Sequence, residues 1–240
     1  MKEGIARNDL AAQVYEVLRK RISTLVAVPG QRIDIGALSA ELGVSPIPIR
    51  EALKQLVERQ MVDLKPNVGY KVAELNDADI AELFSLRRLL ELEALESSLH
   101  LISSAELEEI RYRCEALSSH SGSTRQVRET FCQTDLYFHQ DLIVGRCGNS
   151  LLIRFYDILS DKTSFTIHTS GRVKESSEEH LRIIDAMLQR DIDYAKRMLL
   201  EHICSCEKAC SPLPQSEAEW IAKREHVFGD DPVAEGAVPS

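Results

Sequence analysis

Three histidines and one aspartate in the second half of the chain could together hold a metal ion. Asp135 and His139 are four residues apart, so a helix would place both side chains on the same face. His180 and His202 each fall on an apolar stripe with helical spacing. A lone histidine on such a stripe is more often a hydrogen-bonded core residue than a ligand, but four inward-facing donors indicate a shared purpose. Three nitrogens and one oxygen suit zinc, nickel or manganese.

A thiol-containing metal site is a second possibility, because His202, Cys206 and Cys210 would also share one face of a helix. Thiolates favour zinc, yet the spacing of these residues matches none of the familiar zinc-binding patterns. The set of one aspartate and three histidines is therefore the favoured site. We interpret the six cysteines of the chain as reduced thiols and not as a disulfide framework.

Two basic residues in the first third of the chain, Arg50 and Lys54, are spaced for one face of a helix. The apolar residues of the same segment form a separate stripe, which would leave the basic pair pointing outward. Two further helices precede this segment, the second ending at Gly43, and two short strands joined by a turn follow within residues 62–72. Three helices and a hairpin predict a winged helix-turn-helix over residues 1–75, a fold that inserts one helix into the major groove of DNA.

From residue 76 onward, helical periodicity alternates with turn signals, and no segment shows the alternation typical of strands. Capping boxes that begin at Ser103 and Ser176 mark two helix starts. We predict an all-α bundle over residues 76–210, with about six helices near 77–100, 104–117, 124–144, 149–169, 177–189 and 192–209. Prolines, small residues and mixed charge predict that residues 211–240 form a mostly disordered tail. The fold class is thus mainly α.

The charge distribution allows DNA binding although the net charge is negative. The formal charge of the 240 residues is −9, but residues 1–75 hold 11 basic and 9 acidic residues, against 18 and 29 in residues 76–240. The acidic excess therefore lies outside the predicted DNA-binding domain. No stretch approaches the roughly 18 apolar residues of a membrane span, and the first residues lack the apolar core of a signal peptide. We expect a cytoplasmic protein with no membrane contact.

Three motifs follow one another along the first third of the chain: Gly30-x-Arg32, then Leu38-Ser-Ala-Glu-Leu-Gly-Val-Ser45-x-x-Pro48-Ile-Arg50-Glu-Ala-Leu53-x-x-Leu56, then Gly69-Tyr-x-Val72. In this order they resemble the winged helix of the GntR family of bacterial transcription regulators. The resemblance implies a homodimer on a palindromic DNA operator. It assigns DNA contacts to Arg32, Ser45, Arg50 and Gly69, with Lys54 and Lys71 as further positive charge. Pro46 departs from the pattern, because many members carry a DNA-contacting arginine at that position.

The later motifs Asp135-x-x-Phe138-His139, Glu179-His180-x-x-Ile183 and Asp191-x-x-x-Ala195, the last leading to His202, resemble the FCD domain of the FadR subfamily. The resemblance covers residues 77 to about 205. In that domain an aspartate and three histidines hold a divalent metal, a role that falls here to Asp135, His139, His180 and His202.

The same resemblance implies a small organic-acid effector bound beside the metal. Arg87-x-x-Leu90-Glu91 matches the arginine-bearing first helix of the FCD domain, and Gly148-Asn149 matches the sequence around the ligands. Arg87 and Asn149 are therefore the candidate effector contacts. Helical period places Arg87 on a largely inward stripe, where an arginine needs an anionic partner. The anionic partner of Arg87 is either the effector or, as the alternative, Glu91 one turn later in a salt bridge.

Together these patterns predict a transcription regulator, acting as a repressor, that is not an enzyme. A metal-dependent enzyme acting on a small carboxylate is the alternative, since an open metal position could activate water. That alternative lacks a nucleophile and base pair and leaves the winged helix unexplained. A third possibility is an interaction protein whose helices simply pair with a partner.

Overall fold

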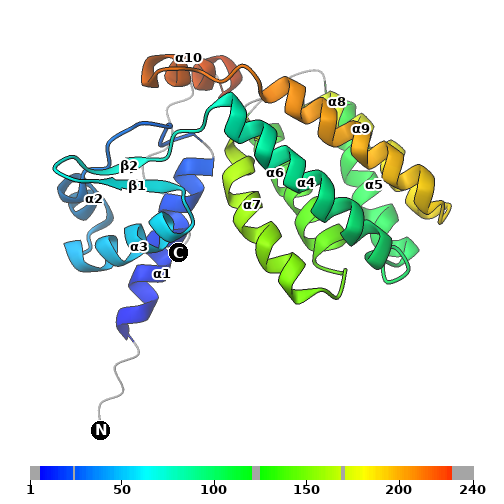
Figure 1. Cartoon of the computed structure of the whole chain (residues 1–240), viewed down its shortest axis with the longest axis horizontal. Helices are drawn as coiled ribbons and strands as arrows, with labels where there is room; N and C mark the ends of the chain where they lie inside the picture. The colour runs from blue at the N-terminus through cyan, green and yellow to red at the C-terminus, as the bar shows by residue number, and fades with distance from the viewer. Residues whose placement is uncertain (1–5, 24, 121–124, 169–170, 229–240) are drawn as a thin grey trace, which may run out of the picture. The chain divides into compact units, whose positions relative to one another are not determined.

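The computed structural model describes residues 6–23, 25–120, 125–168 and 171–228, and it divides the chain into two compact units, with a break between Leu75 and Asn76. The first unit contains a helical part and a two-stranded sheet (Figure 1). Its elements before the break are α1 (Ala6–Ser23), α2 (Ile35–Leu42), α3 (Pro46–Glu58), β1 (Val62–Lys65) and β2 (Gly69–Val72), and Pro214–Glu225 from the later part of the chain also belongs to this unit. This order confirms the predicted winged helix-turn-helix.

Local sequence signals explain where α2 and α3 begin and end. The side chain of Asp34 accepts hydrogen bonds from the backbone N–H groups of Gly36 and Ala37, and Gly43 ends α2 with a φ of 63°. α3 begins at Pro46, in the first turn, where a backbone without an N–H donor loses no helical hydrogen bond. The two helices are therefore separated by a short turn, as a helix-turn-helix requires.

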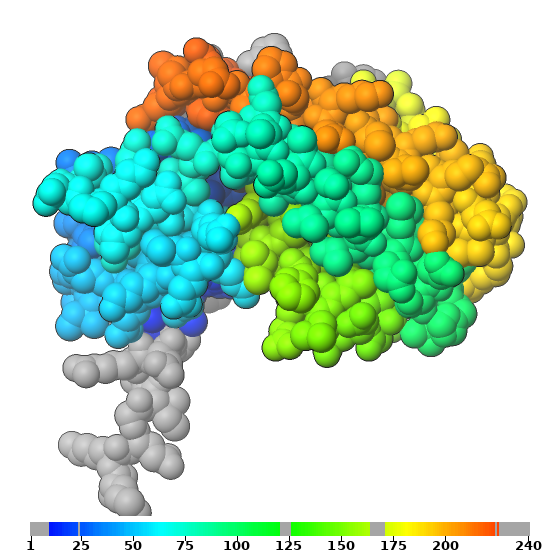
Figure 2. Space-filling view, viewed as in Figure 1, coloured from blue at the N-terminus to red at the C-terminus, as the bar shows by residue number. Residues whose placement is uncertain are grey.

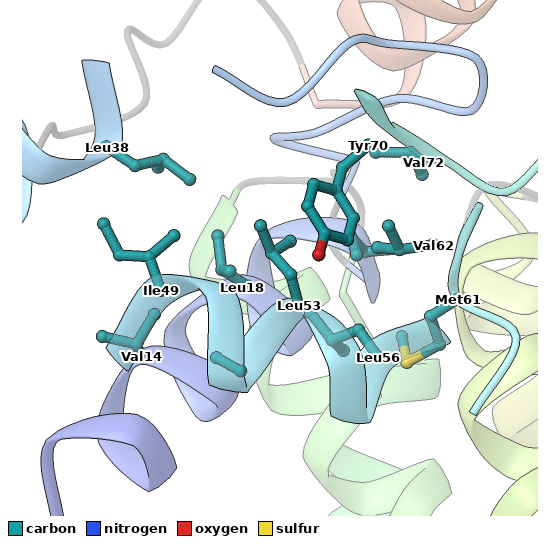
Figure 3. Close-up of a cluster of buried hydrophobic side chains, with 12 residues drawn as sticks. Val14, Leu18, Leu38, Ile49, Leu53, Leu56, Met61, Val62, Tyr70 and Val72 are labelled. Carbon is teal, nitrogen blue, oxygen red and sulfur yellow. The ribbon is translucent and has the colours of Figure 1, made fainter. Parts of the chain in front are cut away.

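The core of this unit joins α1, α3 and the sheet. Figure 3 shows side chains from α1 and α3 packed beneath Tyr70, which comes from β2. Ile49, Leu53 and Leu56 of α3 are fully buried. Because this apolar stripe points inward, the opposite face of α3 is turned to solvent.

The wing is a hairpin extended by a third segment. β1 and β2 pair antiparallel, with Val62 opposite Val72 and Lys65 opposite Gly69. The segment after Gly30 runs along the other edge of β2: Arg32 and Lys71 form an antiparallel bridge, and the backbone N–H of Ile33 donates to the carbonyl of Tyr70 at 2.9 Å. The sheet thus brings Arg32 beside Lys71.

The second unit is a helical bundle (Figure 1). Its elements are α4 (Asp77–Ser98), α5 (Ser104–Ser118), α6 (Arg125–Leu136), the π-helix η1 (Tyr137–Val144), α7 (Ser150–His168), α8 (Val173–Leu188) and α9 (Ile192–Cys210). α8 packs against α5 and α9, and α4 packs against α9, η1 and α7. The mainly α fold class and the all-α character of the bundle are confirmed.

Three details differ from the sequence expectations. The segment predicted as one helix over 124–144 changes from α to π geometry at Tyr137. α8 begins at Val173, not at the capping box that Ser176 was expected to open; Ser176 is buried inside the helix, and Ser177 donates to the carbonyl of Val173 at 2.7 Å. The capping box at Ser103 is present as predicted.

The third difference lies in the predicted tail, residues 211–240. Its described part contains a helix, α10 (Glu217–Phe228), whose Trp220 is 3% exposed. The buried indole explains the order there, since burial of one large aromatic side chain offsets part of the entropy lost on ordering the chain. Residues 229–240 lie outside the described residues. Within the described part of the chain, no helix is both long and apolar enough to cross a membrane.

Candidate metal centre and DNA-binding face

The structure brings the four predicted metal ligands together inside the bundle. Asp135 is near the end of α6, His139 is in η1, His180 is in α8 and His202 is in α9. Their exposed fractions are 6%, 2%, 0% and 1% in that order. One ligand atom from each of the four lies within 4.8 Å of the others, so the group could hold a metal ion.

The three imidazoles meet through the same ring atom. Nε2 of His180 lies 3.1 Å from Nε2 of His139 and 3.2 Å from Nε2 of His202. Oδ1 of Asp135 lies 3.7 Å from Nε2 of His139 and 3.5 Å from Nε2 of His180. Two nitrogens bound to one zinc ion lie about 3.0 Å apart at an octahedral right angle and about 3.4 Å apart in a tetrahedron. The two nitrogen–nitrogen distances of 3.1 and 3.2 Å fall between these values.

A buried carboxylate, Glu91, and a half-buried one, Glu179, fix which nitrogen of two of these histidines carries the proton. Nδ1 of His139 donates to Oε2 of Glu91 at 2.7 Å, and Nδ1 of His202 donates to Oε2 of Glu179 at 2.8 Å. Each neutral ring therefore directs an Nε2 lone pair into the centre. A single N–H on Nε2 of His180 could satisfy only one of these lone pairs, whereas a cation at the centre satisfies all of them.

Burial also favours the neutral, metal-binding form of the imidazoles. Desolvation, reinforced by the neighbouring histidines, lowers the pKa of His180 and of His202 well below the ordinary value. Nδ1 of His180 is buried and lacks a hydrogen-bond partner among the described residues. The centre therefore concentrates uncharged nitrogen donors and one carboxylate in a dry environment, which suits a divalent cation.

Glu91, which the sequence analysis weighed only as a partner for Arg87, is central to this site. It is fully buried on α4 and accepts hydrogen bonds from Nε of Arg87, from Nδ1 of His139 and, at 2.8 Å, from the hydroxyl of Tyr156 on α7. Burial alone would raise the pKa of Glu91, but the charge of Arg87 and the hydrogen bonds from His139 and Arg87 outweigh it and hold the pKa far below its usual range. Glu91 is therefore an ionised carboxylate inside the bundle.

The spacing Ser176-x-x-Glu179 predicts that Glu179 caps a helix, and this prediction is wrong. Because α8 begins at Val173, Glu179 lies two turns inside the helix, where its carboxylate accepts from His202 and, at 2.7 Å, from Nη2 of Arg172. Tyr156 was missed altogether. Only its position on the inward stripe of α7 could have indicated it, since a buried tyrosine hydroxyl requires a partner.

The two candidate effector residues have different surroundings. Arg87 is 2% exposed, pairs with Glu91 as the salt-bridge alternative predicted, and has a second nitrogen, Nη1, that is buried without a hydrogen-bond partner among the described residues. Asn149 is exposed, and its side-chain oxygen caps α7 by accepting from the N–H groups of Leu151 and Leu152, each at 3.1 Å. The structure thus adds a capping role for Asn149, and its contact with an effector stays a prediction.

Of the alternative thiol site, the structure brings together His202 and Cys206 but not Cys210. Cys206 is buried, and its sulfur lies 3.6 Å from Nε2 of His202, while Glu179, His202 and Cys206 form a second group of potential ligands. Cys210 is buried but belongs to neither group among the described residues. Burial raises the pKa of the Cys206 thiol to about 12, so without a metal the sulfur is protonated.

The first unit presents the predicted DNA contacts at its surface. Arg50 and Lys54 are exposed on α3, and Arg32 is exposed beside Lys71 in the sheet. Ser45 is exposed at the N-cap of α3 and makes no side-chain capping bond, which leaves its hydroxyl free of the helix. Gly69 has a φ of 94° in the wing turn, a conformation that favours glycine. The site residues of the wing and of α3 are thus accessible to a ligand.

Comparison with known proteins finds a relative for each of the two units, the winged helix-turn-helix and the helical bundle. Residues 10–72 match the family model described as bacterial regulatory proteins, gntR family, and residues 82–204 match the FCD domain. The chain is 21% identical over 223 residues to the transcriptional repressor RspR of Escherichia coli, a match that covers 88% of this chain and 93% of the relative.

Solved structures show the same fold. E. coli McbR/YncC is similar with a TM-score of 0.71 and 22% identity, over 84% of this chain and 96% of that one. A structure of a metal-free FCD domain is similar with a TM-score of 0.52 and 26% identity, over 57% of this chain and 95% of that one. The matching families contain transcription regulators and not enzymes, which confirms the predicted functional class. A winged helix-turn-helix of GntR type joined to an FCD bundle makes this chain a transcription regulator of the GntR family, in the FadR-like branch that carries the FCD domain.

Proposed function

We propose that this regulator is a homodimeric repressor that binds a palindromic operator and is controlled by a small carboxylate bound beside a divalent metal in the helical unit. The observation that carries this proposal is the convergence of three Nε2 atoms on one point, with Nδ1 of two rings hydrogen-bonded to the carboxylates of Glu91 and Glu179. Proton sharing alone cannot satisfy that arrangement, whereas zinc, nickel or manganese would.

The effector would be recognised by the metal and by Arg87. Four protein ligands leave two positions on a six-coordinate ion, which a carboxylate and an adjacent hydroxyl or carbonyl oxygen can occupy. Nε of Arg87 donates a hydrogen bond to Glu91, while Nη1 of Arg87 is buried and lacks a hydrogen-bond partner among the described residues. A guanidinium nitrogen left in this state is costly, so a bound anion would gain a charge-assisted hydrogen bond there.

Dimer formation is supported by exposed apolar residues on α4 and α7. The two helices pack against each other, and Figure 2 shows them side by side. On α4, Leu86 and Leu89 are 51% and 66% exposed. On α7, Leu151, Phe155 and Ile158 are 56%, 63% and 41% exposed at helical spacing. An apolar surface that spans two adjacent helices is typical of a subunit contact. A two-fold dimer would in turn match a palindromic operator.

On the DNA, α3 would enter the major groove with Arg50 directed at base edges, since a guanidinium matches the two acceptors of guanine. Arg32, Lys54 and Lys71 would contact phosphates, and the wing at Gly69 would approach the minor groove. Effector binding would release the operator only if the effector binds the two conformations of the dimer with different affinity.

The metal proposal is tested by elemental analysis of the purified full chain. We expect about one divalent metal per chain in the wild type, and its loss in His139→Ala and His202→Ala, with a lower melting temperature in both. His100→Ala, which changes an exposed histidine on the surface, is the matched control and should keep the metal. Metal retained in both ligand variants would exclude this centre.

A further inference from the structure

One large apolar side chain is exposed at the start of α3, the helix proposed to enter the major groove. Ile47 is the second residue of α3 and is 63% exposed, whereas Ile49 and Leu53 of the same helix are fully buried and point into the core (Figure 3). Among the described residues, Ile47 belongs neither to the buried core of this unit nor to the partly buried side chains packed against it. The side chain of Ile47 is therefore available to a ligand.

Ile47 shares its exposed face with the two basic residues of α3. Arg50 follows Ile47 by three residues and Lys54 by seven, which is the spacing of one helical face, and both are exposed. Glu51, also exposed, borders Ile47 on the other side. In a helix-turn-helix the N-terminal residues of the second helix contact the base edges, and Ile47 lies in the first turn. An apolar side chain surrounded by charge thus lies where the helix would meet the bases.

Two prolines restrict the backbone on either side of Ile47. Pro46 and Pro48 both lie in the first turn of α3, and each fixes its own φ and supplies no N–H group. The unpaired N–H groups of a helix N-terminus commonly bind phosphate oxygens, but here only Ile47 and Ile49 of the first four residues have one. This turn is therefore rigid and poor in donors for phosphate, which suits contact with an apolar group and reduces the entropy lost on binding.

We propose that Ile47 recognises a thymine in each half-site of the operator through contact with the C5-methyl group of the base. The inference rests on the proposed DNA-binding role of α3. Among the four bases, thymine alone presents a methyl group in the major groove, and apolar side chains make contact with it. Beside any other base, Ile47 would cover hydrogen-bonding groups without replacing their water partners, which costs free energy. Ile47 would therefore add a thymine preference next to the base that Arg50 contacts.

Uracil substitution tests this contact, because uracil differs from thymine only by the absence of the C5-methyl group. The full-length wild type first selects its binding sequence from a library of duplex DNA with a randomised central segment. Each thymine of the selected duplex is then replaced by uracil, at one position of the palindrome at a time, and binding is measured by fluorescence anisotropy. At one thymine of each half-site we expect replacement to weaken binding about fourfold for each methyl group removed.

Three variants assign the methyl contact to a residue. Ile47→Ala should bind the thymine and uracil duplexes equally, and Ile47→Val, which keeps a branched side chain, should retain part of the preference. Leu64→Ala is the matched control, because Leu64 is an apolar residue of β1 in the wing that is 57% exposed. It should retain the full preference, since thymine methyl groups lie in the major groove and the wing would approach the minor groove.

The contrary outcomes separate this proposal from the DNA-binding role on which it rests. A wild type that binds every uracil duplex as tightly as the thymine duplex would overturn the role of Ile47 and leave DNA binding intact. An equal thymine preference in the wild type and Ile47→Ala would assign the methyl contact to another residue. A library from which the wild type enriches no sequence would overturn sequence recognition by α3 itself.

Discussion

His139 of η1 and Glu91 of α4, 48 residues apart in the chain, are joined by a hydrogen bond of 2.7 Å from Nδ1 to Oε2 inside the bundle. The bond determines that Nε2 of His139 faces the candidate metal centre as a lone pair. Because Glu91 also accepts from Arg87, the same carboxylate connects the metal centre to the arginine that would hold the effector. The proposed metal centre and Arg87 thus share one buried carboxylate, that of Glu91.

The first prediction concerns this shared carboxylate. Glu91→Gln should lower metal affinity about 10- to 100-fold, because an amide offers one acceptor oxygen where Arg87 and His139 each need one. The amide nitrogen, itself a donor, would face the N–H of either Arg87 or His139. If it faces Nδ1 of His139, that ring loses the bond that fixes its orientation. Chelator competition on the purified protein measures the change. Glu93→Gln, an exposed neighbour on α4, is the control and should bind metal like the wild type.

The second prediction concerns the pH dependence of stability in the metal-free protein. Since the pKa values of His180 and His202 are lowered in the folded state, the unfolded chain takes up protons first as the pH falls through about 6.5. The free energy of unfolding should therefore be highest above pH 7 and should fall as the pH drops below it, by about 1.4 kcal/mol per pH unit for each histidine.

Denaturant unfolding between pH 5.5 and 7.5 measures this slope. His180→Gln should remove about half of it, and His100→Gln, at an exposed position, should leave it unchanged. A stability of the metal-free wild type that does not change over this range would show that these histidines are not buried neutral in solution. Saturating metal should add stability at each pH, because the ion binds only the folded state.

The sequence predicted most of the fold because its local signals agree with the tertiary packing. Asp34 and Gly43 bound α2, the prolines of α3 lie in its first turn, and Ser103 opens α5 with the capping box. In each case the signal satisfies backbone groups that a helix end would otherwise leave without partners. Such signals act within four residues and are readable from the chain alone.

The start of α8 and the π-helix could not be predicted in this way. Ser176 and Glu179 have the spacing of a capping box, but α8 continues past them to Val173 because Ser176 is buried in the bundle, where the tertiary context overrides the local signal. The π geometry of η1 has no distinct residue pattern. It lies at His139, a location that agrees with the tendency of π-helices to occur at functional sites.

The four metal ligands could be predicted by type and spacing, whereas their partners could not. An i, i+4 pair and inward-facing histidines are visible in one helix at a time. Glu91, Tyr156 and Glu179 reach the centre from helices whose packing is set by long-range contacts. Only the three-dimensional arrangement identifies them.

A third prediction addresses the subunit contact. Phe155→Glu should convert the dimer to a monomer at micromolar concentration, because it places a charge in the middle of the exposed apolar residues of α7. Size-exclusion chromatography with light scattering measures the mass. Tyr112→Glu, at a residue of α5 that is 73% exposed, is the control and should remain dimeric. A wild-type chain that is monomeric with and without DNA would contradict the dimer.

A fourth prediction separates base recognition from phosphate contact. Arg50→Ala should cost about 1 to 3 kcal/mol on the operator and relax base preference at one position of each half-site. Lys54→Ala should weaken binding to all sequences similarly and reduce the salt dependence of the binding constant. Fluorescence anisotropy on DNA from upstream of the gene, at several salt concentrations, measures both. Equal effects of Arg50→Ala on all sequences would assign Arg50 to a phosphate.

The last prediction concerns the effector and depends on Arg87. A panel of small hydroxy, keto, sugar and dicarboxylic acids should contain compounds that raise the melting temperature of the metal-loaded protein and release it from DNA. Arg87→Lys keeps a positive charge near Glu91 but lacks the planar guanidinium that can bind two anions at once. This variant should therefore keep its metal and DNA affinity while its thermal shift with the same acids falls by most of its value.

Metal-stripped protein completes the test of the effector site. If an acid acts equally on the stripped and the loaded protein, the metal is structural and Arg87 acts without it. If only long acyl chains or neutral compounds act, a small carboxylate is the wrong class. A neutral compound in particular would offer no anion to the buried Nη1 of Arg87. Asn149→Ala separates the two roles of Asn149: loss of the cap of α7 should lower stability by about 1 kcal/mol, and an unchanged response to the acids would remove Asn149 from the effector site.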